Sequence, residues 1–151
     1  MQPTHQHHIV LVEDSDSDVF LVKEAFARHN LVFQLTVLDD GEKAIDFVRS
    51  LDGDDAQDCP HLYLVDLNLP KLSGDLVLEQ IRKSRRCSDT PVMIITSSAS
   101  PRDKAETNRL GATSFFQKPS RLDEFLKLGS VVAELLSNRN KSHHDSKDVE
   151  T

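Results

Sequence analysis

Carboxylate, hydroxyl and amine side chains follow four short apolar runs in this sequence of 151 residues, each at the point where the run ends. The residues concerned are Glu13 and Asp14, then Asp66, Thr96 and Lys118. Carboxylates packed together repel one another unless a cation joins them, and Mg²⁺ prefers oxygen ligands of this kind. A metal with open positions can also bridge protein oxygens to a phosphoryl group. If the fold gathers these side chains, they predict a Mg²⁺-dependent phosphoryl site.

Within such a site the residue types indicate different roles. Asp66 ends the strand that we expect to be the most buried, and a carboxylate can attack phosphorus to give an acyl phosphate. Lys118 offers a point charge to a phosphoryl oxygen, and Thr96 offers a hydroxyl donor. Each residue also has a plainer interpretation: Glu13 and Asp14 could cap a helix, Asp66 could begin a turn, and the other two could be an ordinary strand-end hydroxyl and a surface charge. Their combination, in this order, favours the functional interpretation.

The strands and helices that must position these residues are predicted from the spacing of the apolar residues and from the glycine, proline and polar segments between them. Strands are expected over 8–12, 33–38, 61–65, 91–95 and 113–117, and helices over 16–29, 42–51, 73–85, 101–110 and 121–138. Strands that alternate with helices predict an α/β fold, a doubly wound five-stranded parallel sheet with helices on both faces. Ligands of such sheets bind beyond the carboxyl ends of the strands, where all five residues fall.

Charge, hydropathy and cysteine usage exclude several classes of partner and site. The formal net charge is −7, and residues 1–66 hold 14 acidic against 4 basic side chains, which argues against a nucleic-acid partner. No apolar run is long enough to span a bilayer and no signal segment is visible, so we expect no membrane partner and a cytoplasmic protein. Cys59 and Cys87 stand apart in polar surroundings, which predicts neither a disulfide nor a zinc site.

The chain is expected to form one domain over residues 8–138, between disordered ends at 1–7 and 139–151. Histidines near both ends, His5, His7, His8, His143 and His144, are interpreted as unstructured. The segment 52–60 is a long polar loop, and its four aspartates, Asp52, Asp54, Asp55 and Asp58, have no assigned role.

Four segments resemble the signatures of the response-regulator receiver domain of two-component signalling. They are VEDSDSD (12–18), DLNLPKLSG (66–74), IITS (94–97) and FFQKP (115–119). The resemblance implies a single-domain, flavodoxin-like fold with strand order 2-1-3-4-5. It also implies a phosphoacceptor signalling protein that is not an enzyme, phosphorylated on Asp66 by the phosphohistidine of a sensor histidine kinase.

The same resemblance assigns individual residues. Mg²⁺ ligands are Asp14, Asp66 and the backbone carbonyl of Asn68, with Glu13 acting largely through water. Lys118 contacts the phosphoryl group, and its bond to Pro119 is expected to be cis. Thr96 and Phe115 match the hydroxyl and the aromatic ring that move together when the family switches state.

Two other classes use a related site or fold. A phosphatase of the haloacid dehalogenase type would need an acid where this chain has Asn68, whose amide cannot transfer a proton in that way. A flavin carrier would need a glycine- and hydroxyl-rich first turn, and Glu13 and Asp14 would repel its phosphate.

The remaining expectations concern output. No effector domain is visible, so the signal is expected to leave through a surface, with Leu128, Val131 and Leu135 of the last helix forming a homodimer face; a wide core-facing stripe is the alternative. Among stand-alone receivers the chain looks most like the small regulators of bacterial and cyanobacterial phytochromes, which points to a bacteriophytochrome as the kinase. A monomeric chemotaxis-type receiver and a phosphorelay intermediate remain as alternatives.

Overall fold

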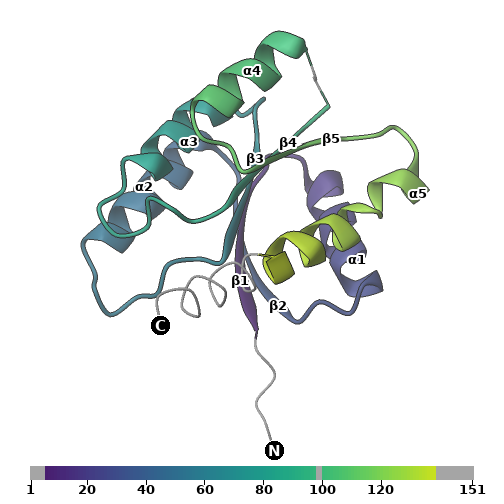
Figure 1. Ribbon diagram of the computed structural model, residues 1–151, viewed down its shortest axis with the longest axis horizontal. Helices are drawn as coiled ribbons and strands as arrows, with labels where there is room; N and C mark the ends of the chain where they lie inside the picture. Colours follow the sequence, from purple (N-terminus) through teal and green to yellow (C-terminus); the bar gives the residue numbers. More distant parts are fainter. Residues whose placement is uncertain (1–5, 98–99, 139–151) are drawn as a thin grey trace, which may run out of the picture.

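The five apolar runs form one parallel sheet in the order β2-β1-β3-β4-β5, as the sequence predicts. The computed structural model describes residues 6–97 and 100–138 (Figure 1). The strands are β1 (His7–Val12), β2 (Phe33–Leu38), β3 (Leu62–Asp66), β4 (Val92–Thr96) and β5 (Ser114–Gln117). The helices are α1 (Asp16–Arg28), α2 (Gly41–Asp52), α3 (Gly74–Arg82), α4 (Pro101–Arg109) and α5 (Leu122–Phe125).

Two apolar cores hold the helices against the sheet. Helices α1 and α5 cover one face, and α2, α3 and α4 cover the other (Figure 1). The first core includes Ile9, Leu11, Val22, Phe26, Phe125 and Leu128, and the second includes Val10, Val12, Ala44, Val48, Val77 and Leu78. Successive residues of β1 therefore point into opposite cores, and both β3 and β4 are buried throughout, as central parallel strands should be.

The last helix differs from the continuous one predicted over 121–138. Helix α5 ends at Phe125, a turn occupies 126–127, and residues 128–138 are helical again. In the turn, hydrogen bonds join residues three apart, such as the Gly129 N–H to the Leu126 carbonyl. Gly129 lies so close to α1 that an added Cβ would stand 2.2 Å from the carbonyl oxygen of Ala25. The C-terminal helical segment is thus pressed against the last turn of α1.

This packing buries one residue of the expected dimer face. Leu128 is fully buried in the first core, and Val131 and Leu135 are partly buried against the same core. Residues 128–138 pack against both α1 and the sheet, and this packing accounts for a second apolar stripe on the last helix. Leu128 therefore belongs to the core, as in the wide core-facing stripe that the sequence left as the alternative, and a dimer face at Val131 and Leu135 stays a prediction.

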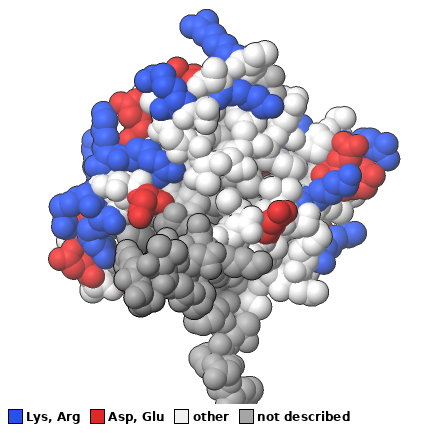
Figure 2. Space-filling view, in the orientation of Figure 1, with Lys and Arg blue, Asp and Glu red and all other residues white. Residues whose placement is uncertain are grey.

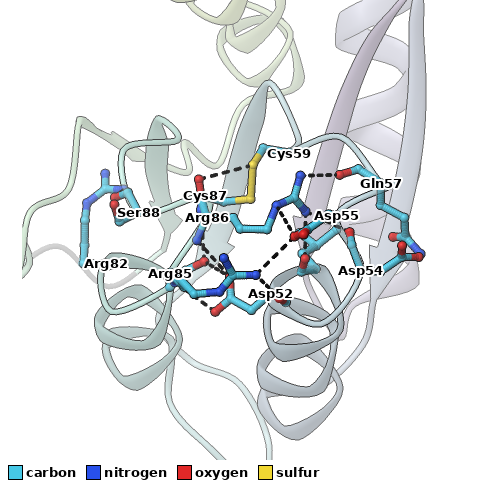
Figure 3. The surroundings of a disulfide bond; sticks show 12 residues. Asp52, Asp54, Asp55, Gln57, Cys59, Arg82, Arg85, Arg86, Cys87 and Ser88 are labelled. Atoms are coloured by element: carbon cyan, nitrogen blue, oxygen red, sulfur yellow. Dashed lines mark hydrogen bonds and ion pairs between the residues drawn. A yellow bond between two sulfur atoms is a disulfide. The ribbon is translucent and has the colours of Figure 1, made fainter.

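Cys59 and Cys87 form a disulfide, so the expectation of two isolated cysteines is also wrong. The two residues are 28 apart in sequence, but each lies just before one of the neighbouring parallel strands β3 and β4. Parallel neighbours start at the same edge of a sheet, which brings the two Cα atoms to 5.7 Å. Arg86 and Asp52 surround this bond at the edge opposite the strand-end residues (Figure 3).

The long polar loop is organised by this cluster. The Arg86 guanidinium donates to the carbonyl oxygens of Leu51, Asp54 and Gln57 at 2.7, 3.0 and 2.8 Å. The Asp52 carboxylate accepts from the Ser84 hydroxyl at 2.7 Å and from the backbone N–H groups of residues 85 and 86 at 2.9 and 3.0 Å. We call the disulfide, Asp52, Arg85 and Arg86 the loop clamp.

Three further observations concern the boundaries of the domain, membrane spans and the charge on the surface. Strand β1 begins at His7, one residue before the expected boundary, so the interpretation of His7 and His8 as unstructured is wrong. Most of the ends predicted to be disordered, with His5, His143 and His144, lies outside the described residues. Within the described part of the chain, no helix is long and apolar enough to cross a membrane. On the face drawn in Figure 2, acidic and basic side chains lie next to one another along the rim.

Candidate functional site

Lys118 is the centre of the strand-end site, because its ammonium group donates to three carboxylates that come from distant parts of the chain. The acceptors are Glu13 Oε1 at 2.5 Å, Asp18 Oδ2 at 2.7 Å and Asp66 Oδ2 at 2.8 Å. The backbone N–H of Lys118 donates to the Thr96 carbonyl at 2.8 Å, which extends the β4–β5 pairing by one step and fixes where the lysine leaves the sheet. The structure thus brings Glu13, Asp66 and Lys118 together as the sequence predicts.

The acidic residues form a cluster that could hold a metal ion. One carboxylate oxygen from each of Glu13, Asp14 and Asp66 lies within 4.8 Å of the others. Glu13 is 1% exposed and Asp66 is buried, whereas Asp14 faces solvent. An all-oxygen set with one open side fits a hard divalent cation such as Mg²⁺, which keeps several waters when it binds proteins.

Burial and charge change the acid–base behaviour of this cluster. Removal from water raises the pKa of Glu13 to about 7, although the hydrogen bond from Lys118 acts in the opposite direction. Burial by itself lowers the pKa of Lys118, but the hydrogen bonds to Asp18, Asp66 and Glu13 outweigh it and raise that pKa above the ordinary lysine value. The lysine is therefore held firmly as a cation, and the carboxylates around it outnumber it.

Local backbone contacts orient the acidic side chains. The Asn68 N–H donates to Asp66 Oδ1 at 3.0 Å, and the Ser15 N–H donates to Glu13 Oε2 at 3.2 Å. Gly74, the first residue of α3, lies against the same turn, and an added Cβ would stand 2.1 Å from the Asp66 carbonyl oxygen. The strand-to-helix turn after β3 is therefore tight, and it holds the Asp66 carboxylate between Asn68 and Lys118.

Of the two residues expected to switch, Thr96 is linked to the site and Phe115 lies farther along the sheet, on the side of α4. Thr96 is fully buried, and its Oγ1 accepts from the Asn68 side-chain amide at 3.2 Å. Phe115 is half-buried against the second core, with Lys104 Nζ 5.5 Å from its ring centroid. A hydrogen-bonded chain thus runs from Asp66 through Asn68 to Thr96, and Phe115 lies on the side of α4.

Asp18 is a site residue that sequence reasoning missed. The sequence places it only within the predicted helix over 16–29, where an acidic side chain in the first turn is ordinary. Its contact with Lys118 joins residues 100 apart in sequence. The one sequence signal is its place one helical turn after Asp14, which keeps it close to the end of β1.

One expectation taken from the resemblance is wrong at this site. No peptide bond among the described residues is cis, so Lys118 and Pro119 are joined in the trans form. A bond before proline prefers trans by only about 0.5–1 kcal/mol, so the residue pair alone does not decide the isomer.

Comparison with known proteins now places these features in a family. The model of the response regulator receiver domain matches residues 9–128. The probable methanogenesis regulatory protein FilR2 of Methanothrix harundinacea is 31% identical over 134 residues, which cover 89% of this chain and 86% of FilR2. Response regulator Rcp1 of Synechocystis is 32% identical over 120 residues, which cover 80% of this chain and 82% of Rcp1.

Two solved structures extend the comparison to three dimensions. The Mn²⁺-bound form of Rcp1 matches with a TM-score of 0.74 and 30% identity, over 83% of this chain and 91% of that one. The phosphorylated cyanobacterial phytochrome response regulator RcpA matches with a TM-score of 0.78 and 28% identity, over 87% and 94% of the two chains. The sheet order, the strand-end site and the match over residues 9–128 agree, and the chain belongs to the response regulator receiver domains of two-component signalling.

Proposed function

We propose that this protein accepts a phosphoryl group on Asp66 from the phosphohistidine of a sensor histidine kinase, in a reaction that needs Mg²⁺. The observation that carries the proposal is the convergence of Lys118 on Glu13, Asp18 and Asp66 beside a three-carboxylate cluster. Both oxygens of Asp66 are held, Oδ1 by the Asn68 N–H and Oδ2 by Lys118, so the carboxylate is oriented before a phosphoryl group arrives.

In the proposed reaction an Asp66 oxygen attacks phosphorus, the P–N bond to the donor histidine breaks, and the histidine nitrogen takes a proton. Lys118 carries a fixed positive charge next to the attacking carboxylate and can donate to an oxygen of the arriving phosphoryl group. Glu13, Asp14, Asp66 and the Asn68 carbonyl would hold Mg²⁺, which when bound supplies positive charge to the phosphoryl oxygens. The Thr96 hydroxyl, which the Asn68 amide links to this site, can turn toward the phosphoryl group.

The direct test is labelling with a small phosphodonor, acetyl phosphate, in Mg²⁺ and in a chelator. We expect one phosphoryl group per chain in Mg²⁺ and none in the chelator. The Asp66→Asn variant should take up none, whereas Asp75→Asn, which changes a nearby acid in the first turn of α3, should label like the unaltered protein. Labelling that persists in Asp66→Asn would remove Asp66 as the acceptor.

We further propose that the donor is a kinase of the phytochrome class. This proposal is supported by the likeness to Rcp1 and to RcpA, the latter a phytochrome response regulator. Phosphotransfer from a purified bacteriophytochrome kinase should be faster than from kinases that sense other signals. Equal rates across such a panel would contradict the proposal, while Asp66 labelling by acetyl phosphate would stand.

The output is proposed to pass through the surface of α4, β5 and α5, with a homodimer as the signalling state and the cytoplasm as its location. Phe115 lies on this surface, where it lines a groove of about 350 Å³ together with Lys104 and Thr107. A light-scattering mass of two chains in the presence of beryllofluoride, a phosphoryl mimic, is the expected result. A mass of one chain with and without the mimic would favour the monomeric chemotaxis-type alternative.

A further inference from the structure

The three carboxylates that hold Lys118 are not equivalent. Glu13 and Asp66 also belong to the acidic cluster that could bind a cation, whereas Asp18 is not part of it. Asp18 is also the most exposed of the three, at 26%, against 1% for Glu13 and 7% for Asp66. Asp18 therefore contacts the lysine without being committed to the proposed metal.

The position of Asp18 is set by the start of α1. Ser15 is the N-cap, and its hydroxyl oxygen accepts from the Asp18 N–H at 3.3 Å. This bond fixes the first helical turn, so that the Asp18 carboxylate projects toward Lys118. Asp16 lies in the same turn and is exposed, and it belongs neither to the acidic cluster nor to the three carboxylates that hold the lysine. Asp16 is therefore a natural control.

Lysine needs such an anchor because its side chain is long and flexible. A free lysine side chain carries roughly 2 kcal/mol of rotamer entropy. An ammonium group that must first move into position stabilises the transition state less than one that is already held in place. The Lys118 ammonium has three N–H groups, and the three carboxylates accept from all of them. When Asp66 becomes an acyl phosphate, the bond to Asp66 Oδ2 has to be redirected to a phosphoryl oxygen. The bond to Asp18 takes no part in that exchange and can persist through it.

We propose that Asp18 is a positioning residue that holds Lys118 beside Asp66 before, during and after phosphoryl transfer. This inference rests on the proposed phosphorylation of Asp66. It goes beyond that proposal by adding a residue that acts through the lysine and touches neither the metal cluster nor the reacting carboxylate.

The test compares Asp18→Asn with Asp16→Asn, two variants that each remove one carboxylate from the first turn of α1. The rate of Asp66 labelling is measured at saturating acetyl phosphate over a series of Mg²⁺ concentrations. We expect Asp18→Asn to lower the maximal rate about 10-fold, in the range found for residues that orient a reactive group. The Mg²⁺ concentration for half-maximal labelling should stay unchanged, and Asp16→Asn should match the unaltered protein.

Two further variants separate positioning from folding. Asp18→Ser keeps a residue suited to the start of a helix but has no carboxylate, so it should lose rate like Asp18→Asn. Asp18→Glu keeps the charge on a longer side chain and should recover part of the rate. Thermal unfolding of each variant, followed by circular dichroism, shows whether the domain is intact.

Several outcomes would overturn the inference. A maximal rate in Asp18→Asn that equals the rate of the unaltered protein would show that the lysine needs no anchor. An equal fall in both would show a general effect of charge at the helix start, and a higher Mg²⁺ requirement in Asp18→Asn would make Asp18 a metal residue. Absence of labelling in the unaltered protein, or labelling of Asp66→Asn, is a separate result that contradicts the proposed phosphorylation itself.

Discussion

The two ends of the sheet differ in the balance between acidic and basic side chains. At the carboxyl ends of the strands, Lys118 contacts the carboxylates of Glu13, Asp18 and Asp66, and Asp14 lies close to two of these acids, so negative charge exceeds positive. At the other end, the Asp55 carboxylate meets the guanidinium groups of Arg85 and Arg86. The Asp52 carboxylate accepts from the Ser84 hydroxyl and from the backbone N–H groups of residues 85 and 86, so two acids and two arginines balance one another within the chain. Excess charge that the chain does not neutralise indicates a place for something from outside, whereas balanced charge indicates architecture.

The largest effect of a single substitution is expected at Lys118. Lys118→Met should lower the free energy of unfolding by about 3–5 kcal/mol in a chelator, because it leaves buried carboxylates without a counter-charge. Urea unfolding measures this change, and Lys83→Met, which alters an exposed lysine in a surface pair, is the control. A loss no larger than that of the control would mean that the cluster is already neutralised without the lysine.

At the other end, the largest contribution should come from the disulfide. Reduction, or the double change Cys59→Ser and Cys87→Ser, should lower the free energy of unfolding by about 2–4 kcal/mol, because a crosslink across 28 residues restricts the unfolded chain. The Asp66 labelling rate should not change, since the bond lies at the opposite edge of the sheet. A changed labelling rate at constant folding would show that the two ends are coupled.

Metal addition should affect one end only. Mg²⁺ at 100 times its Kd should raise the free energy of unfolding by about 2.7 kcal/mol. In a chelator, Asp14→Asn should melt above the unaltered protein, because it removes one of the repelling carboxylates, and it should gain less from Mg²⁺. Asp16→Asn should gain as much as the unaltered protein; an equal gain in Asp14→Asn would exclude Asp14 as a ligand.

Acid should affect the loop clamp through Asp52. The Ser84 hydroxyl and the N–H groups of residues 85 and 86 lower the pKa of Asp52 in the folded state below its ordinary value of 3.8. A lowered folded-state pKa stabilises the protein above the unfolded value, and the contribution is lost as pH falls through the lowered one. Asp52→Asn should therefore lower the Tm at pH 7, and the difference from the unaltered protein should shrink on acidification. The matched change Asp55→Asn, at an exposed position, should have a smaller effect.

The smallest expected effect is at Tyr63. Its hydroxyl is the one buried side-chain polar atom, among the described residues, without a hydrogen-bond partner. Burial, followed by the charge of Asp52, raises the pKa of this phenol, so it stays neutral. Tyr63→Phe removes an unsatisfied group and should raise the free energy of unfolding by about 1 kcal/mol. A loss of stability would show that the hydroxyl has a partner, such as a bound water.

The contrast also explains which features could be read from the sequence. The gathering of Asp66, Thr96 and Lys118 follows from one rule, that parallel strands end at the same edge of a sheet, and the apolar runs were clear. The strand order came from the family resemblance, and the structure confirms it. The disulfide obeys the same geometry at the opposite edge, but nothing in the residues around Cys59 and Cys87 marks them as a pair.

Two other features depend on packing that periodicity does not contain. The Asp18 contact requires the Lys118 side chain, which follows β5, to reach the first turn of α1, and no local sequence pattern reports this. The stripe of Leu128, Val131 and Leu135 has the same spacing whether it faces a partner or the core. The close approach that Gly129 permits to α1 puts Leu128 in the core and leaves Val131 and Leu135 partly exposed.

The large sequence separation between Lys118 and its partners has a consequence for synthesis of the protein. Its partners Glu13, Asp18 and Asp66 precede it by 105, 100 and 52 residues. A nascent chain leaves the ribosome from its N-terminus, so the acidic residues emerge long before the cation that joins them. The proposed phosphoacceptor site is therefore completed late, with β5, and a chain that stops short of this strand would keep the acidic residues but lack Lys118.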